Sequence, residues 1–384
     1  MARLGDICTV VSGSTPKTNI PEYWDGDVKW ITPAELNEDS CYLFDSQRHI
    51  SELGKEKTGL SYMPAGTVIL SSRAPIGKTA IAGCELCCNQ GFKNLICSDA
   101  IFNEYLYFFL KSKTDYLNSL GRGATFKEIS KSIVENIEIR LPSLEEQKKA
   151  AKQLGHIYHL ISLREQQLSK LDELVKSRFI ELFGNLVIGD KVDTNKKKIG
   201  EIASVTKLAG FEFTKYIQYK EQGDIIMLRG LNCKKGHLVL DDIKWIDKET
   251  SDLLPRSKLY YGDILMTYAG TIGDVAMVDA DDKYHLAPNV AKITLNNKKA
   301  CNPVFLMHLF MYTNDYIMTF ASVVAQASIN MEKIRNFEYY FPPVEQQNQF
   351  AAFVEQTDKS KLVIQQSLAE LETLKKALMQ KYFG

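Results

Sequence analysis

Three short stretches of this sequence come close to motifs that carry out chemistry. Residues 302–305 read NPVF, with Val304 where the Asn-Pro-Pro-aromatic motif of amino-methyltransferases has a second proline. Asn302 and Pro303 also fit a helix cap and first turn, which accounts for the stretch without chemistry. Residues 146–148 read EQK, the only E-x-K spacing of the kind used by nucleases, and they lie at a predicted helix start. The GRG at 121–123 does not extend to GxGxxG, and no P-loop GxxxxGK[ST] occurs. The sequence therefore predicts a chain that is not an enzyme and binds no cofactor itself.

Cysteines are the next candidate ligands. The chain has eight, and the densest group is Cys84, Cys87 and Cys88, with Cys97 nearby. A metal site would need a second pair or a neighbouring histidine, so we interpret these as reduced thiols packed inside a cytoplasmic protein and expect no metal. No run of about 18 apolar residues occurs, which predicts no membrane span, and the N-terminus does not resemble a signal peptide.

Charge is balanced over the whole chain. Lys plus Arg number 47 and Asp plus Glu also number 47. This balance excludes a histone-like polycation but leaves local basic faces possible.

A proline–glutamate–glutamine phrase occurs twice, as LPSLEEQ at 141–147 and FPPVEQQ at 341–347. Both copies read P-x-x-E-x-Q, and both continue without a gap to a Phe-Gly pair that ends at Gly184 or Gly384. Upstream, residues 102–120 align with 302–320, and 64–81 resemble 260–277. The chain is therefore predicted to be two copies, about 5–184 and 200–384. Glycine, proline and apolar positions match while polar positions differ, which indicates one scaffold with two different recognition surfaces.

Each copy begins with short β-rich runs broken by Gly, Pro and Asn, contains a helix near 103–118 or 303–318, and ends in a long helix. Apolar residues follow the two long helices at spacings of three and four, which predicts a seam for a partner helix. The seams are Leu154, Ile157, Ile161, Leu168, Leu171, Val175 and Leu182, and Phe350, Val354, Ile364, Leu368, Leu371, Leu374 and Leu378. We predict an α+β fold: two mixed α/β domains joined by two long helices packed as an antiparallel coiled coil, with an internal pseudo-twofold repeat. The expected boundaries are 1–140 for the first domain, 141–184 for the first helix, 185–340 for the linker and second domain, and 341–384 for the second helix.

Several of these stretches together resemble the specificity subunits of type I restriction–modification systems. They are SGSTPKTNIPEYWDGDVKWITPAEL at 12–36, RAPIG at 73–77, NQGFKNLI at 89–96 and the two P-x-x-E-x-Q helix starts. The resemblance covers essentially the whole chain, although TKLAGFEFTKYIQYKEQGDI at 206–225 lacks the TPKT and EYW elements of the first copy. It implies two target-recognition domains that read the halves of a bipartite, asymmetric site in double-stranded DNA. It also implies helices that set the gap and dock two methyltransferase subunits, with restriction subunits joining the complex. S-adenosylmethionine and ATP with magnesium would then be bound by those partner subunits.

Polar residues in the Gly- and Pro-broken stretches are the predicted DNA contacts. Arginine is the usual partner of guanine, lysine of phosphate, and amides of adenine. In the first copy these residues are Thr15, Lys17, Arg73, Lys78, Gln90, Lys93, Arg122 and Lys127. In the second copy they are Arg229, Tyr268, Thr271, Asn289, Lys292 and Gln326. For any one of them taken singly, a solvated surface side chain is the favoured explanation, because surface lysine and arginine are usual. Trp24 and Trp30 could stack on bases or pack in a core.

The recurring helix starts are the predicted docking sites for partner subunits. These residues are Pro142, Glu145, Gln147, Pro342, Glu345 and Gln347. Acids in a first turn are also favoured by the helix dipole, which is the alternative explanation for the glutamates. A different function for the whole chain is an interaction scaffold whose globular ends bind proteins rather than DNA.

Overall fold

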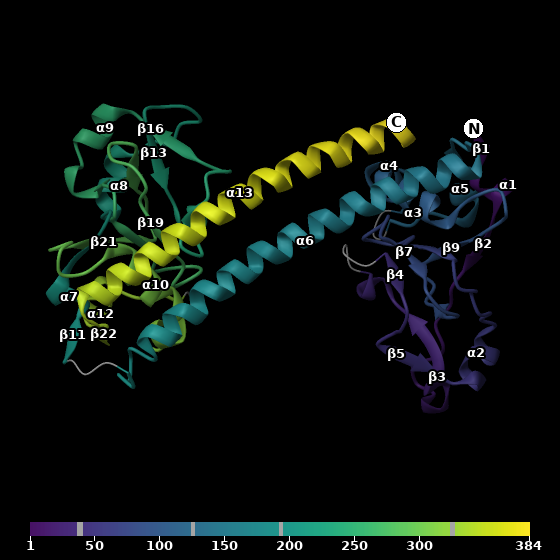
Figure 1. Ribbon diagram of the computed structural model, residues 1–384, viewed down its shortest axis with the longest axis horizontal. Helices are drawn as coiled ribbons and strands as arrows, with labels where there is room; N and C mark the ends of the chain where they lie inside the picture. The colour runs from purple at the N-terminus through teal and green to yellow at the C-terminus, as the bar shows by residue number, and fades with distance from the viewer. Residues whose placement is uncertain (37–40, 124–126, 192–194, 323–326) are drawn as a thin grey trace. The chain divides into compact units, whose positions relative to one another are not determined.

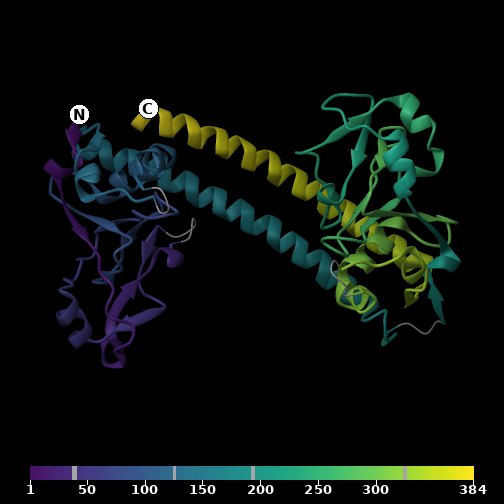
Figure 2. The ribbon, with the colours of Figure 1, turned by 180° about the vertical axis from the view of Figure 1, so that it is seen from behind.

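The computed structural model describes residues 1–36, 41–123, 127–191, 195–322 and 327–384. The chain forms two compact units (Figures 1 and 2). Unit 1 contains Met1–Gln167 and Ile364–Gly384, and unit 2 contains Leu168–Val363. Each unit is mixed α/β, and each of the two longest helices contributes residues to both units.

Unit 1 is built on a five-stranded sheet with the order β2-β9-β6-β7-β4. Its strands are Cys8–Ser12, Lys93–Cys97, Val68–Leu70, Thr79–Ala82 and Tyr42–Leu43. Only the pairing of β4 with β7 is parallel. A second sheet has the order β5-β3-β8, formed by Arg48–Ile50, Trp24–Ile31 and Cys87–Cys88, and β1 (Ala2–Arg3) pairs with β10 (Glu138–Ile139). The shorter helices are α1 Leu4–Ile7, α2 Glu52–Thr58, α3 Asn103–Ser112, α4 Thr114–Leu120 and α5 Lys131–Glu135, with 3-10 turns at Pro21–Tyr23 and Pro33–Glu35.

The core of unit 1 lies between the five-stranded sheet and the long helices. The middle of helix α3 is buried on all sides, from Tyr105 to Leu110. Such a segment must be covered all round, here by strand residues such as Val68 and by Leu154 and Phe383 from the long helices.

Unit 2 repeats this plan with other residues. One sheet has the order β12-β21-β18-β19, formed by Ala203–Lys207, Val290–Leu295, Ile264–Thr267 and Val275–Met277. The second sheet, β16-β13-β20-β17, is formed by Lys244–Ile246, Ile225–Leu228, Tyr284–Leu286 and Lys258–Leu259. The two-stranded pairs are β14 Cys233–Lys234 with β15 His237–Leu238, and β11 Lys196–Lys198 with β22 Glu338–Tyr340. The shorter helices are α7 Ile199–Ile202, α8 Gly210–Tyr216, α9 Lys248–Asp252, α10 Pro303–Tyr312, α11 Asn314–Met318 and α12 Met331–Arg335, with 3-10 turns at Gly230–Asn232 and Pro255–Ser257.

Equivalent backbone hydrogen bonds occur in the two units. The central strands β3 and β13 each pair with one antiparallel and one parallel neighbour. At the start of each unit, Leu4 N donates to Ile137 O at 2.9 Å, as Ile199 N does to Phe337 O at 2.9 Å. The predicted helix near 103–118 is in fact two helices with a break at Lys113, and its counterpart breaks at Thr313. Asn302 caps α10 through its side chain, which confirms that prediction.

The two longest helices are α6 (Leu144–Phe183) and α13 (Val344–Phe383), each of 40 residues. Within unit 1 the hydroxyl of Tyr382 donates to Gln153. Within unit 2 Lys361 lies 2.7 Å from Asp172, and the rings of Phe350 and Phe179 have their centroids 5.2 Å apart. In unit 2, residue numbers fall along α13 as they rise along α6, so the two segments run antiparallel there.

The predicted seams are buried unevenly. Leu154, Ile157, Ile161, Val175, Phe350 and Val354 are buried. Leu374 is 45% exposed, so its assignment to a buried seam was wrong. In the described part of the chain no helix is long and apolar enough to cross a membrane.

Candidate nucleic-acid interface

Four loops of unit 1 meet at one end of its five-stranded sheet. The loop after β2, the β6–β7 connection and the loop before β9 leave the same end because these strands are antiparallel neighbours. Backbone hydrogen bonds join them: Ser14 N to Cys88 O at 3.0 Å and Ser72 N to Gly91 O at 2.7 Å. The fourth loop, which precedes α5, is held by Ile129 N donating to Ser72 O at 3.0 Å.

All eight residues predicted to contact DNA in the first copy lie on these loops or directly beside them. They are Thr15, Lys17, Arg73, Lys78, Gln90, Lys93, Arg122 and Lys127. The hydroxyl of Thr15 donates to the side-chain oxygen of Gln90, which joins the first and third loops. Lys78 donates to the carbonyl of Leu36 at 3.0 Å, so its ammonium is partly satisfied within the unit. The structure therefore brings residues from four separate stretches of sequence to one surface.

Glu128 lies at the centre of this surface, and sequence reasoning missed it. Its Oε2 accepts from Arg73 Nε at 2.9 Å and its Oε1 from Lys93 Nζ at 3.2 Å. Its backbone forms β-bridges with both Arg73 and Arg122. Burial alone would raise the pKa of Glu128, but the hydrogen bonds from Arg73 and Lys93 outweigh it and hold that pKa below its ordinary value. The carboxylate is therefore ionised at neutral pH, with both oxygens engaged.

The two tryptophans of the first copy hold the TPKT loop. Trp30 is 2% exposed and donates its indole N–H to Ser14 O at 3.0 Å, while Trp24 donates to Lys17 O at 3.2 Å. Their rings pack edge to face at 5.2 Å, and the guanidinium of Arg48 lies 3.9 Å from the Trp24 ring centroid. Core packing, rather than base stacking, is therefore the role of Trp30. Arg48 is a cationic residue that the sequence analysis did not select.

In unit 2 the corresponding loops carry different side chains. Tyr268 N donates to Asn289 O at 3.0 Å, and Ile329 N donates to Tyr268 O at 2.8 Å, as Ile129 does to Ser72 in unit 1. The ammonium of Lys207 lies 5.5 Å from the Tyr268 ring centroid. Arg229 is not on these loops: it follows β13 of the second sheet, where Asp242 holds it at 2.8 Å.

The remaining predicted contacts of unit 2 are placed differently. Thr271 is exposed on the β18–β19 connection. Asn289 has a positive φ of 67°, a conformation that asparagine adopts more readily than most residues. Gln326 lies outside the residues that the structure describes.

Burial corrects two of the predicted lysine contacts. Lys292 is 8% exposed, and its ammonium donates to the carbonyl oxygens of Arg256 and Lys258, both at 2.9 Å. Burial also lowers the pKa of Lys292. Lys93 is 7% exposed and bound to Glu128. Neither ammonium is free to reach a phosphate, so Lys93 acts on this surface through Glu128 and Lys292 supports the sheet.

Comparison with known proteins places this geometry in a family. The profile of the type I restriction modification DNA specificity domain matches residues 1–173 and again residues 191–373. The chain belongs to this family. Specificity subunits of type I systems are non-catalytic, and the catalytic activities lie in other subunits, so the prediction that this chain is not an enzyme is confirmed.

Two curated relatives match this chain over different lengths. The MjaIX specificity subunit of Methanocaldococcus jannaschii is 37% identical over 246 residues, covering 63% of this chain and 55% of the relative. The MjaVIII specificity subunit of the same organism is 23% identical over 397 residues, covering 99% of this chain and 90% of the relative. The chain thus spans little more than half of the first relative and most of the second.

Solved structures support the fold. The S subunit of a type I restriction–modification system from M. genitalium has a TM-score of 0.57 at 14% identity, covering 100% of this chain and 95% of that one. A chain from a study of complex assembly and conformational transition in a type I system has a TM-score of 0.61 at 17% identity, covering 100% and 96%. At these identities the likeness shows the fold alone.

The glutamines of the two helix starts are structural in this specificity subunit. Gln147 is fully buried; its side-chain oxygen accepts from Phe102 N at 2.8 Å, and its amide donates to Pro142 O at 2.9 Å. Gln347 makes the same two bonds, to Asn302 N at 2.9 Å and Pro342 O at 2.8 Å.

The docking prediction is therefore corrected for the buried members of the motif. Gln147, Gln347 and Pro342 are buried, so they do not form an exposed docking surface. Pro142 is half-buried, and Glu145 and Glu345 are exposed, so for these three residues docking stays a prediction.

Replacing Gln147 by leucine is expected to lower the free energy of unfolding by about 1–3 kcal/mol. The amide of Phe102 and the carbonyl of Pro142 would lose a buried partner that water cannot replace. Urea denaturation followed by circular dichroism measures the loss. Glu145→Gln, on the exposed side of the same turn, serves as the control and is expected to change stability by less than about 0.5 kcal/mol. Equal losses in the two variants would show that the buried bonds contribute nothing.

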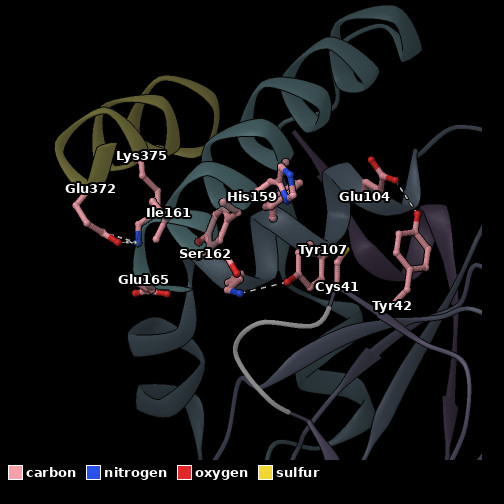
Figure 3. Close-up of a pocket in the computed structure, with 14 residues that line it drawn as sticks. Cys41, Tyr42, Glu104, Tyr107, His159, Ile161, Ser162, Glu165, Glu372 and Lys375 are labelled. Carbon is pink, nitrogen blue, oxygen red and sulfur yellow. Dashed lines mark hydrogen bonds and ion pairs between the residues drawn. The ribbon is translucent and has the colours of Figure 1, made fainter. Parts of the chain in front are cut away.

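A cavity of about 420 Å³ opens in unit 1 between α3, α6 and α13 (Figure 3). Tyr107 and Lys111 of α3 form one wall, where the lysine donates to the tyrosine hydroxyl at 3.2 Å. Lys375 and Glu372 of α13 are paired with each other on the other side. Gly155 of α6 leaves room here, since an added Cβ would meet only the ring of Phe108, at 3.9 Å.

A second cavity, of about 380 Å³, lies in unit 2 at the start of α13. Lys197, Asn297 and Pro343 are among its lining residues. Among the described residues, no group of three or more His, Cys, Asp or Glu side chains is placed to hold a metal ion.

Proposed function

We propose that this chain is the DNA-recognition subunit of a type I restriction–modification complex and that it reads a bipartite, asymmetric site. The loop surface of unit 1 would read one half-site and the corresponding loops of unit 2 the other. The observation that carries the proposal is one backbone framework with unlike side chains. The β-bridge between Arg73 and Glu128 in unit 1 recurs in unit 2 between Ala269 and Ser328. Such a pair of readers suits two unlike half-sites, whereas an identical dimer would need a palindrome.

The long helices would set the distance between the half-sites. In this proposal α6 and α13 pack as one antiparallel coiled coil, related by a pseudo-twofold axis together with the two domains. The first recognition domain is 1–140, the linker and second recognition domain are 185–340, and the spacer helices are 141–184 and 341–384. Because each helix contributes to both units, a stiff pair would fix the number of unspecified base pairs between the two readings.

Partner subunits would supply the chemistry. Two methyltransferase subunits would dock on the helices, with the exposed glutamates Glu145 and Glu345 as equivalent contacts, and restriction subunits would join them. S-adenosylmethionine and ATP with magnesium would be bound by those partners in the cytoplasm. The zero net charge of the specificity subunit gives it little non-specific affinity for DNA, so the partners would add the basic surface.

Selection of random duplexes by the chain co-expressed with its methyltransferase subunit tests this function. We expect two specified patches of unlike sequence, separated by unspecified base pairs of constant number, with methylated adenines in the same site. Enrichment of no bipartite sequence by an assembled complex would reject the proposal and favour the interaction scaffold, whose globular ends bind proteins.

A further inference from the structure

Glu128 holds two cations that come from different stretches of the sequence. Arg73 follows β6 and uses Nε, while Lys93 begins β9 and uses Nζ. The backbone of Glu128 is held as well, since Glu128 N donates to Arg122 O at 2.9 Å and Arg122 N donates back to Glu128 O at 3.0 Å. The Lys93 side chain is 9% exposed, so Glu128 is bound on one side by a buried ammonium.

Glu128 engages only one of the nitrogen atoms of the Arg73 guanidinium. The Arg73 side chain is 46% exposed, and within the described part of the chain its two terminal amino groups have no hydrogen-bond partner. A guanidinium fixed at Nε keeps its plane, and its terminal N–H groups form the rigid fork that suits bidentate recognition. In the major groove, O6 and N7 of guanine present the two matching acceptors.

A carboxylate facing DNA needs a reason to be there. Alone, Glu128 would repel the phosphates, but Arg73 and Lys93 leave the trio with one net positive charge. The lowered pKa of Glu128 agrees with a carboxylate that stays ionised while it holds both cations. An amide or hydroxyl could accept a bond from Arg73 but could not balance the buried ammonium of Lys93.

We propose that Glu128 is the specificity-determining positioning residue of the first half-site, which holds Arg73 for bidentate donation to O6 and N7 of one guanine. This inference rests on the proposed function and names one base, a guanine, that the first half-site would require. At the equivalent described positions of unit 2, Ala269 and Ser328 form the bridge and carry no such ion pair, so the second half-site would be read by other side chains.

The test compares selected sites for wild type, Arg73→Ala, Glu128→Gln and the double variant, each as the complex with the methyltransferase subunit. Wild type is expected to require a G·C pair at one position of the first half-site. Arg73→Ala is expected to reduce the preference for that pair by about tenfold or more. Glu128→Gln is expected to relax the same position, and the double variant to be no worse than Arg73→Ala, because the two residues act as one unit.

Two controls separate a local effect from misfolding. The second half-site and the gap must be selected unchanged by every variant. Glu85→Gln, the same substitution at an exposed residue at the other end of β7, must leave the first half-site unchanged.

Several outcomes would overturn the inference. Uniform weakening by Arg73→Ala at all base positions would make it a phosphate contact. Uniform tightening by Glu128→Gln, with no base position relaxed, would mean that the carboxylate only offsets charge. Unchanged selection by Glu128→Gln, or additive losses in the double variant, would show that Glu128 does not position Arg73. A wild-type complex that selects no bipartite site would instead reject the proposed function, and this inference with it.

Discussion

Duplexes selected by a variant with seven extra residues in each long helix are expected to keep both half-sites and to carry a gap longer by about three base pairs. Seven helical residues add about 10 Å, and each base pair adds about 3.4 Å along DNA. Seven is also the repeat of an antiparallel seam, so the apolar residues beyond the insertion keep facing the partner helix. Insertion after Gln167 and after Val363 places the added turns between the two units.

Binding to the original site should fall by about a hundredfold or more, because the second half-site would no longer be engaged together with the first. A variant in which seven residues at the same places are replaced without a change in length is the control, and it should keep the original gap. Selection of the original gap by the lengthened variant would mean that the helices do not set the spacing. Selection of new bases in either half-site would mean that the insertions disturbed the reading loops.

The long helices illustrate what the sequence could predict. Their observed bounds, Leu144–Phe183 and Val344–Phe383, lie within three residues of the expected segments 141–184 and 341–384, because capping and apolar spacing are both local signals. Ser143 and Glu146 form a capping box at the start of α6, with Ser143 N donating to the carboxylate at 3.0 Å. Leu374 could not be placed this way. A helix of 3.6 residues per turn drifts from a strict seam over 40 residues, so which late leucine stays covered depends on the partner.

The sequence analysis identified the loops of the candidate interface but not the contacts between their side chains. Gly- and Pro-broken stretches identified all four loops of unit 1. Arg73 and Glu128 are 55 positions apart in the sequence. Their ion pair depends on how β6 and the loop before α5 come together in the fold, which no sequence spacing reveals. Burial of Lys93, Lys292 and Gln147 is likewise tertiary. Lysine and glutamine side chains are usually exposed, and only the packed sheet or the start of α3 shows the groups that bind these three.

Replacing Phe350 by alanine is expected to lower the free energy of unfolding of unit 2 by about 3–5 kcal/mol. Phe350 is fully buried, and its ring lies 5.2 Å from Phe179 and 5.7 Å from Phe183, centroid to centroid. Phe305 of α10 packs on the same two rings, so the cluster joins both long helices to the domain. Removing one ring creates a cavity and also removes favourable edge-to-face contacts.

Urea denaturation measures this loss, with Leu362→Ala as the matched control on the same helix. Leu362 is 56% exposed and should change stability by less than about 0.5 kcal/mol. Under the proposed function the effect on DNA reading would be one-sided. At a urea concentration where the Phe350→Ala complex has lost unit 2, it should still enrich the first half-site while the second becomes random. A Phe350→Ala loss no larger than that of Leu362→Ala, or equal decay of the two half-sites, would show that this cluster does not hold unit 2 on the helices.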